Sequence, residues 1–208
     1  MKILVACEES QIVTKAFRNK GHEAYSCDIQ ESSGGHPDWH IQDDVLKVLK
    51  YKWDVIIAFP PCTDLSNIQA GPVMHKKLIQ GKPQKAMEFI KVIWNSCEVV
   101  CIENPISSYL NRNWIPYSQI IEPYFFGHNY HKKTCLWLKN LPPLISTCWN
   151  NPTHILVDSY NHKNKLNRKP PLFTNIKRKD RAKIRSKFHE NVAEAMANQW
   201  TEEIIFNK

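Results

Sequence analysis

The sequence has no apolar run approaching the ~20 residues that a membrane-spanning helix requires. Its first residues also lack the basic start and apolar stretch of a secretory leader. These absences predict a cytoplasmic protein that does not engage a membrane. No internal repeat or low-complexity tract occurs, and 208 residues are enough for one core, so we expect a single domain with appendages.

A disulfide framework and a metal site are both disfavoured by the cysteine and histidine pattern. The seven cysteines are odd in number, and several lie in apolar, strand-like runs, so we expect them to be reduced. The pairs His36 with His40 and Cys97 with Cys101 have spacings that a metal could use. Neither pair is completed by a second one at ligand spacing, so no metal site is predicted.

Acidic residues are scarce in the C-terminal half. Residues 1–110 hold 12 Lys/Arg and 13 Asp/Glu, whereas residues 111–208 hold 16 and 7. Between Lys163 and Lys187, eleven basic residues accompany a single acid, Asp180. Such a stretch can supply the sequence-independent attraction to phosphates that dominates nucleic-acid binding, although a solvated basic loop that maintains solubility is the alternative. The uneven charge favours a polyanionic partner.

Short apolar runs alternate with amphipathic segments along the first 140 residues. Strands are predicted at Lys2–Cys7, Glu23–Cys27, Trp53–Phe59, Val99–Ile102 and Cys135–Leu138. Helices are predicted at Ser10–Lys20 with Ser10 as the N-cap, at Asp43–Leu49, at Pro83–Asn95 and at Asn191–Ile205, with loops at 31–40 and from Pro60 to about Gly81. This alternation predicts a doubly wound, Rossmann-like α/β fold that binds ligands at the carboxyl ends of its strands.

An acid at the end of the second predicted strand, Asp28, is placed to accept hydrogen bonds from ribose hydroxyls, which implies a nucleoside-bearing cofactor. Glycine is rare, with six residues in all, and the first turn, Ala6-Cys7-Glu8-Glu9-Ser10, has none. A loop that cradles phosphates needs glycines, and two carboxylates would repel pyrophosphate. Dinucleotides and ATP are therefore disfavoured. S-adenosylmethionine, a sulfonium cofactor without phosphate, suits the acidic turn better.

The turn Phe59-Pro60-Pro61-Cys62 follows the strongest predicted strand. Amino-methyltransferases use a similar turn, but there Asp, Asn or Ser precedes the two prolines and an aromatic residue follows them. A cysteine on a turn fixed by prolines is held with its sulfur toward the crevice, as a nucleophile requires, and the alternative is a small buried hydrophobe. A cysteine-dependent phosphatase would need an arginine six residues on, where Ile68 stands.

Two further motifs follow in the sequence. Glu103-Asn104-Pro105 closes the next strand, and a carboxylate at a buried strand end is more often functional than structural because burial without a partner is costly. Lys132 and Lys133 then precede the strand at Cys135–Leu138. Basic residues there can hold a phosphate near the crevice, although a solvated turn is the alternative.

In this order, the Pro60-Pro61-Cys62 turn, Glu103-Asn104 and Lys132-Lys133 resemble the cytosine-5 DNA methyltransferase family. The chain looks most like the short, phage-type members, which share its opening KILVACEESQ and the closing pattern around Arg185 and residues 193–200. The resemblance implies DNA as partner, S-adenosylmethionine as cofactor and a bacterial or phage-infected host. The catalytic set would be Cys62 as nucleophile, Glu103 as the acid that protonates the base, and Asn104, while the cofactor contacts would be Cys7, Glu8, Asp28, Asp44 and Pro60.

The sequence departs from the family at several places. Cys7-Glu8-Glu9 stands where the family has a glycine-rich motif, and Thr63 stands where it has glutamine. Large members also carry a long recognition domain. Here we predict a core at 1–148, a reduced basic recognition region at 149–187 and a packing helix at 188–208. Lys132, Lys133, Lys177, Arg178 and Arg181 are the predicted nucleic-acid contacts.

Two other functions stay open at this point. The chain could be an inactive nucleic-acid-binding module on a methyltransferase scaffold, which the short recognition region suggests. It could also be an enzyme that modifies free cytidine nucleotides, although the basic C-terminal half would then have no use.

Overall fold

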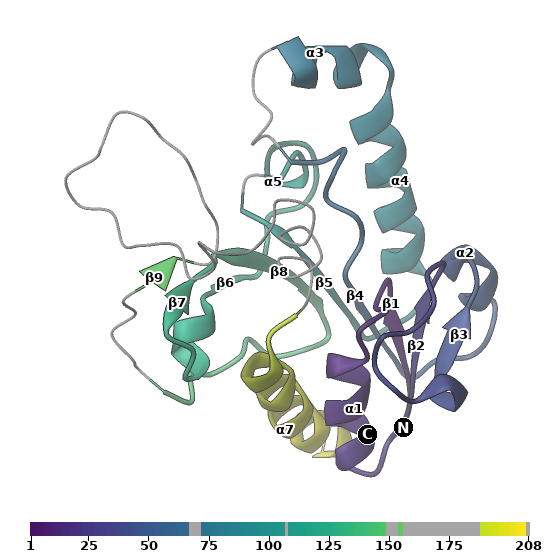
Figure 1. The fold of residues 1–208 in the computed structure, drawn as a ribbon, viewed down its shortest axis with the longest axis vertical. Helices are drawn as coiled ribbons and strands as arrows, with labels where there is room; N and C mark the ends of the chain where they lie inside the picture. The colour runs from purple at the N-terminus through teal and green to yellow at the C-terminus, as the bar shows by residue number, and fades with distance from the viewer. Residues whose placement is uncertain (67–71, 107, 149–153, 156–187, 207–208) are drawn as a thin grey trace.

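The computed structural model describes residues 1–66, 72–106, 108–148, 154–155 and 188–206, the backbone alone at 154–155 and 203–206. A seven-stranded sheet has the order β3-β2-β1-β4-β5-β8-β6, and a second sheet pairs β7 with β9 (Figure 1). The strands are β1 (Lys2–Ala6), β2 (Glu23–Asp28), β3 (His40–Gln42), β4 (Val55–Ala58), β5 (Val100–Pro105), β6 (Gln119–Ile121), β7 (Tyr130–His131), β8 (Thr134–Lys139) and β9 (His154–Ile155). The helices are α1 (Ile12–Asn19), α2 (Val45–Val48), α3 (Pro72–Ile79), α4 (Lys82–Asn95), α5 (Leu110–Asn113) and α7 (Glu190–Phe206), with 3-10 turns η1 (Pro37–Trp39) and η3 (Pro123–Phe126).

The larger sheet is mostly parallel. Strands β3, β2, β1, β4 and β5 all run the same way, β8 is antiparallel to β5, and β6 is antiparallel to β8. Apart from the inserted β8, this is the 3-2-1-4-5-6 order of doubly wound folds. The predicted doubly wound, Rossmann-like α/β fold is confirmed by this strand order.

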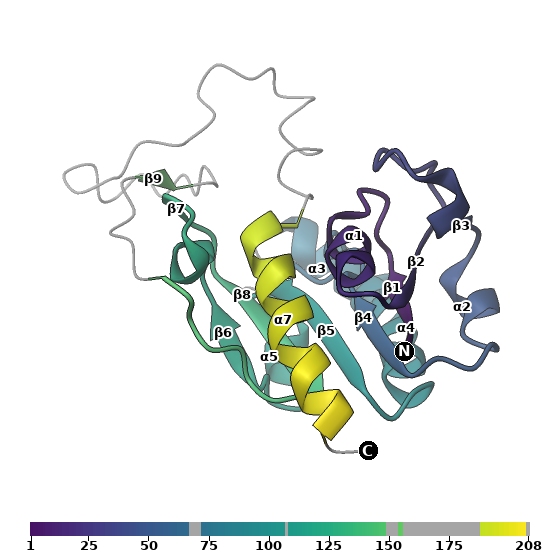
Figure 2. The same ribbon diagram turned by 90° about the horizontal axis from the view of Figure 1, so that it is seen from below.

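Side chains alternate along each strand, so each strand presents residues to both faces of the sheet. Helices cover both of these faces. On one face, Ile3 and Ile57 pack with residues of α1 and α7. On the other face, Leu4 and Ile56 pack with residues of α2, α4 and α5. Figure 2 shows α1 and α7 side by side over the first of these faces. The strands are therefore buried on both sides, which explains why their sequences are continuously apolar.

The C-terminal helix α7 behaves as the packing helix that its periodicity predicts. Val192, Ala195, Met196 and Trp200 are all at most 2% exposed. The indole Nε1 of Trp200 donates to the carbonyl of Pro142 at 3.0 Å, so the polar end of this large side chain is also satisfied.

The cap of α1 differs from the prediction. Ser10 does not cap the helix. Instead, the Glu8 carboxylate accepts hydrogen bonds from the backbone N–H groups of Val13 and Thr14, at 2.7 and 3.2 Å, and from the Thr14 hydroxyl at 2.7 Å. Gln11, at the N-cap position, has a left-handed φ of 57° and makes no side-chain cap. The longer side chain of Glu8 reaches forward across this turn and bonds the N–H groups of Val13 and Thr14, which a side chain at the Gln11 N-cap position would otherwise bond.

Several helices and strands were not predicted from the sequence. The loop predicted from Pro60 to Gly81 contains α3, and the loop predicted at 31–40 contains η1 and the start of β3. The three-residue strands β3 and β6 are too short to show an alternating pattern. The helix predicted at Asp43–Leu49 is present but shorter, as α2.

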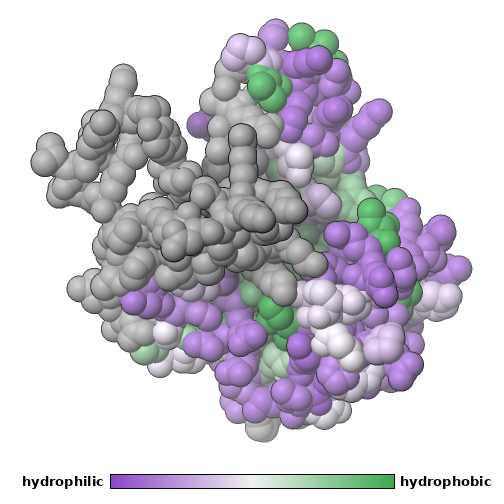
Figure 3. Space-filling model, viewed as in Figure 1, coloured by the Kyte–Doolittle hydropathy of each residue, from purple (hydrophilic) through white to green (hydrophobic). Residues whose placement is uncertain are grey.

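Helix α3 and the first half of α4 project from the body of the domain (Figure 1). The exposed side chains of α3 include the apolar Val73 and Ile79, which are 53% and 74% exposed. Figure 3 shows small green patches at the top of the view, where α3 lies in Figure 1, and the coloured part of this face is otherwise largely hydrophilic. Among the helices of the described residues, none is both long and apolar enough to cross a bilayer.

Candidate functional site

The carboxyl ends of four parallel strands lie level with one another. Ala6 pairs in register with Cys27 and with Ala58, and Ala58 pairs with Ile102. The residues that follow, Cys7, Asp28, Phe59 and Glu103, therefore share one edge of the sheet. The backbone N–H of Phe59 donates to the carbonyl of Ala6 at 2.9 Å, which continues the pairing to that edge. The predicted site residues thus come from four strands to one place.

The proline turn after β4 is fixed at both ends. Pro60 is buried, whereas Cys62 is half-buried. The carbonyl of Cys62 accepts hydrogen bonds from the N–H groups of Leu65 and Ser66, at 3.0 and 2.7 Å. Ser66 in turn forms a β-bridge with Ser108, beyond the end of β5. The cysteine therefore stands on an ordered turn that is tied to the neighbouring strand end.

Asn104 links β5 to this turn. The side chain is fully buried, and its Nδ2 donates to the carbonyl oxygen of Pro60 at 3.3 Å. Its Oδ1 is buried too and has no hydrogen-bond partner among the described residues. Because an unpaired buried acceptor is costly, this oxygen is suited to accept a hydrogen bond from a bound molecule.

Glu103 lies beside Asn104 at the same strand end. Burial raises the pKa of its carboxyl, while the charge of Lys132 and the hydrogen bond with Thr134 act in the opposite direction. The net effect favours the protonated form relative to an exposed glutamate. A carboxyl of this kind can deliver a proton at a pH where an ordinary glutamate is already ionised.

At the end of β1, Cys7 adopts a left-handed φ of 59°, a conformation that glycine adopts more easily. The turn therefore has a backbone conformation that is typical of glycine, although a cysteine occupies the position. Burial, followed by the negative charge of Asp28, raises the pKa of the Cys7 thiol to about 12, with further contributions from Cys27 and Asp44. The thiol is consequently neutral near pH 7 and is not itself a nucleophile.

Glu8 is 4% exposed, and burial raises its pKa to about 6. Its carboxylate is engaged at the start of α1, as described above. This side chain therefore caps the helix. A contact between Glu8 and a cofactor stays a prediction.

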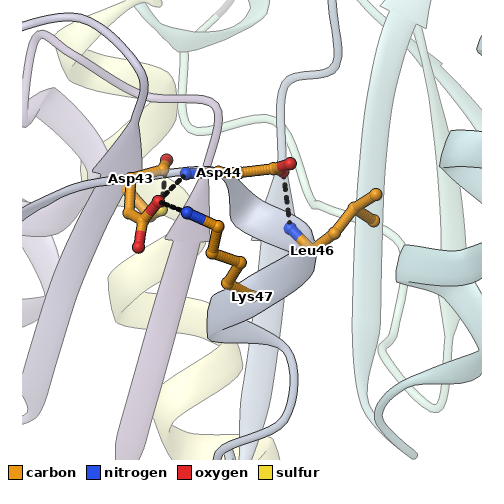
Figure 4. Close-up of polar contacts among 5 residues, drawn as sticks. Asp43, Asp44, Leu46 and Lys47 are labelled. Carbon is orange, nitrogen blue, oxygen red and sulfur yellow. Dashed lines mark hydrogen bonds and ion pairs between the residues drawn. The ribbon is translucent and has the colours of Figure 1, made fainter.

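The acids after β2 and β3 are more accessible. Asp28 accepts a hydrogen bond from the N–H of Gln30 at 2.9 Å, and its backbone carbonyl accepts from Asp43. Asp44 caps α2 by accepting from Leu46 N–H at 2.9 Å, and Asp43 forms a 2.8 Å ion pair with Lys47 (Figure 4). Hydrogen bonds from Lys47 and from the Asp44 N–H lower the pKa of Asp43.

The basic residues before β8 are held by a buried acid that the sequence analysis missed. Glu122 is 3% exposed and accepts hydrogen bonds from the backbone N–H of Lys132 at 2.9 Å and from His131 Nδ1 at 3.3 Å. Lys132 is half-buried and acts electrostatically on Glu103, whereas Lys133 is exposed. The structure therefore brings Lys132 to the site and turns Lys133 toward solvent.

Other predicted residues lie outside the described part of the chain. These are Lys177, Arg178 and Arg181, and with them nearly all of the predicted recognition region at 149–187. Among the residues that the structure does describe, no group of three His, Cys, Asp or Glu side chains could hold a metal ion.

Thr134, at the start of β8, is the second residue that sequence reasoning passed over. Its hydroxyl forms hydrogen bonds with Glu103 Oε1 and, at 3.0 Å, with the backbone carbonyl of Asn104. The only signal in the sequence was its place directly after Lys132-Lys133, which gave no reason to connect it with an acid 31 positions earlier.

Comparison with known proteins finds similarity among solved structures, whereas no protein-family model and no curated protein matches the chain. Among solved structures, it is similar to an E. coli protein provisionally described as a DNA modification methyltransferase encoded within a prophage. The identity is 12%, the TM-score is 0.48, and the match covers 71% of this chain and 51% of that one. The chain thus spans about half the length of this neighbour. Its doubly wound, Rossmann-like α/β fold rests on its own strand order and register.

Proposed function

We propose that this chain is an S-adenosylmethionine-dependent DNA methyltransferase that modifies C5 of cytosine through a covalent adduct with Cys62. The observation that carries the proposal is the hydrogen bond from Asn104 Nδ2 to the carbonyl of Pro60, which joins the cysteine turn to the Glu103 strand end. A cysteine and a carboxyl with a raised pKa then stand at neighbouring strand ends. Cytosine needs both a nucleophile and an acid to become reactive at C5.

The proposed chemistry divides between these two residues. The Cys62 thiolate adds to C6 of the ring, and the Glu103 carboxyl gives its proton to N3, so that C5 becomes nucleophilic. After C5 has accepted the methyl group, a base such as water takes the C5 proton and the Cys62 sulfur leaves as thiolate. N3 returns its proton to Glu103, which restores the aromatic ring. Because C6 is hidden in stacked duplex DNA, the base must be flipped out or presented on a single strand.

The cofactor proposal is supported by the charges around the β1 turn. Asp28 and Asp44 both act on the Cys7 thiol and raise its pKa, so this part of the edge carries negative potential. Such an edge suits a cationic sulfonium and repels a pyrophosphate. S-adenosylmethionine would supply the methyl group. Asp28 would hold its ribose hydroxyls, and Cys7, Glu8, Asp44 and Pro60 would line the remainder of the site.

DNA as the partner is supported by charge. The net charge is +8, and its excess lies in the C-terminal half. Lys132 is placed at the site by Glu122. Lys133 and the basic residues Lys177, Arg178 and Arg181 would hold phosphates on either side of the flipped base.

DNA that contains 5-fluorocytosine tests the proposed adduct directly. Fluorine at C5 blocks the last elimination, so a covalent complex that survives denaturation should accumulate when S-adenosylmethionine is present. We expect Cys62→Ser to abolish this complex and Cys148→Ser, another half-buried cysteine, to leave it intact. An adduct that persists undiminished in Cys62→Ser would refute the assignment.

Tritiated S-adenosylmethionine distinguishes the possible acceptors. The proposal expects label in duplex or single-stranded DNA and in neither RNA nor dCMP. DNA binding without any transfer would instead identify an inactive binding module. Label in dCMP alone would identify a nucleotide-modifying enzyme.

A further inference from the structure

The hydroxyl of Thr134 meets more acceptors than it has protons. Thr134 is 3% exposed and pairs with Pro105 at the end of β5, which points its side chain at the Glu103-Asn104 strand end. Its Oγ1 lies within hydrogen-bond reach of both Glu103 Oε1 and the backbone carbonyl oxygen of Asn104. A hydroxyl donates a single proton, and a carbonyl can only accept.

The two protonation states of Glu103 use this hydroxyl differently. When the carboxyl is protonated, it can donate to Thr134 Oγ1, and Thr134 then donates to the carbonyl of Asn104, so both contacts are satisfied. When the carboxyl is ionised, it is the stronger acceptor, and the Thr134 proton turns toward it. Rotation of the Thr134 hydroxyl therefore provides a hydrogen bond to Glu103 in both protonation states, and the carboxyl does not have to move.

Other ionisable groups near Glu103 do not compete for this role. Cys101 on β5 has its pKa raised well above the usual value by burial and by the charge of Glu103. Burial also raises the pKa of Cys135 on β8 to about 11, despite a hydrogen bond from Asn111. Both thiols are therefore neutral near pH 7. Lys132 is the charged neighbour, and it favours the ionised carboxylate.

We propose that Thr134 is a positioning residue whose hydroxyl switches its proton between Asn104 and Glu103 as Glu103 gives up and regains its own. No covalent bond of Thr134 breaks in this exchange, and only its hydrogen bond to the Asn104 carbonyl is given up. The proton that leaves Glu103 goes to the acceptor base, and the Thr134 hydroxyl rotates to the carboxylate that remains. The delivery of that proton to cytosine rests on the proposed function, whereas the switch itself is a property of the free protein.

The switch can be measured without any substrate. Full-length protein carrying glutamate labelled with ¹³C at the carboxyl carbon is titrated by NMR, and Glu103→Gln identifies the Glu103 signal. Thr134→Val removes the donor to the ionised carboxylate while keeping the shape of the side chain, so the pKa of Glu103 should shift upward. Thr134→Ser retains the hydroxyl and should titrate close to the wild type. Thr201→Val, which removes a hydroxyl from α7 that bonds His22, should not move the signal.

An unchanged or lowered pKa in Thr134→Val would overturn the proposal, and so would a Thr134→Ser variant that titrates like Thr134→Val. If Thr134→Val does not fold, Thr134→Ala against Thr134→Ser makes the same comparison, because the two differ by one hydroxyl. Methyl transfer by the same variants is assayed separately. If transfer is absent even in the wild type, the proposed function fails while the titration still decides the switch. If transfer occurs, its alkaline limit should move upward with the pKa in Thr134→Val.

Discussion

Asn104 and Pro60 are 44 positions apart in the sequence, and the side-chain amide of one donates to the backbone carbonyl of the other at 3.3 Å. This bond joins the end of β5 to the turn after β4, and the β-bridge between Ser66 and Ser108 adds a second link between the two segments. Both partners of the Asn104 hydrogen bond are buried. The Asn104 side chain therefore helps to orient the Cys62 turn relative to Glu103, although it forms no covalent bond in the proposed reaction.

Asn104→Ala should loosen that turn. The substitution removes the donor to a buried carbonyl, and an unpaired buried group costs about 1–3 kcal/mol in free energy of unfolding. We expect urea denaturation to show a loss of this size, together with slower capture of 5-fluorocytosine DNA. Asn113→Ala is the matched control, because Asn113 makes the same kind of bond to the carbonyl of Tyr109 at an exposed site. Equal losses in the two variants would contradict a special role for Asn104.

Glu103→Gln should separate chemistry from structure. Glutamine keeps the size of the side chain and its ability to bond Thr134, but it cannot deliver a proton to the base. A positioned acid contributes about 10²–10⁴-fold to a rate, so turnover should fall within that range while binding of S-adenosylmethionine is retained. Cofactor affinity from calorimetry and single-turnover methylation provide the two measurements. Wild-type turnover in this variant would show that Glu103 is structural.

The strand ends could be predicted because parallel strands repeat one simple pattern. Continuous apolar runs marked β1, β4 and β5, and the polar residues that follow such runs meet at a single edge of a doubly wound sheet. Asp28, at the end of β2, and Glu103, near the end of β5, were expected at this edge, and the strand register places both residues there. Their roles stay predictions.

Contacts between distant segments could not be predicted in the same way. Thr134 contacts Glu103 because β8 pairs antiparallel with β5. The apolar sequence of β8 does not indicate whether the strand runs parallel or antiparallel to its neighbour. The start of α1 was misread for a related reason. Ser10 has the better intrinsic preference for an N-cap, but the tertiary position of Glu8 lets its longer side chain bond free N–H groups in the first turn of the helix.

The raised pKa of Glu8 is expected to make the free energy of unfolding depend on pH. Burial raises its pKa from 4.5 to about 6, so between these values the folded state binds more protons than the unfolded state. The contribution of Glu8 is therefore fully present below pH 4.5 and is lost as the pH rises through 6. A shift of this size corresponds to about 2 kcal/mol.

Glu8→Gln isolates this effect because glutamine does not titrate. The unfolding free energy of the wild type minus that of Glu8→Gln, measured in urea at about pH 4 and about pH 7.5, should decrease by about 2 kcal/mol as the pH rises. The amides at the start of α1 could instead stabilise the ionised carboxylate enough to lower its pKa. The difference would then grow with pH, and the prediction would be wrong.

The basic tract is expected to contribute affinity rather than sequence choice. Its residues lie outside the described part of the chain, so the prediction rests on composition: a run of lysine and arginine meets phosphates and carries no base-edge geometry. Replacing Lys177, Arg178, Lys179 and Arg181 together by alanine should weaken binding to every DNA sequence alike. The slope of log affinity against log salt should become shallower by up to ~0.9 for each phosphate that the variant no longer neutralises.

The measurement compares a preferred duplex with a scrambled one over a range of salt concentrations. Lys50, Lys52 and Lys20, exposed lysines of the N-terminal half, provide a control set whose replacement should leave the slope unchanged. An unchanged slope in the quadruple variant would exclude phosphate contacts by this tract. Weakening confined to the preferred duplex would have a different meaning. Phosphate contacts do not depend on sequence, so the tract would then have to contact base edges. Residues 149–187 would in that case form a recognition element.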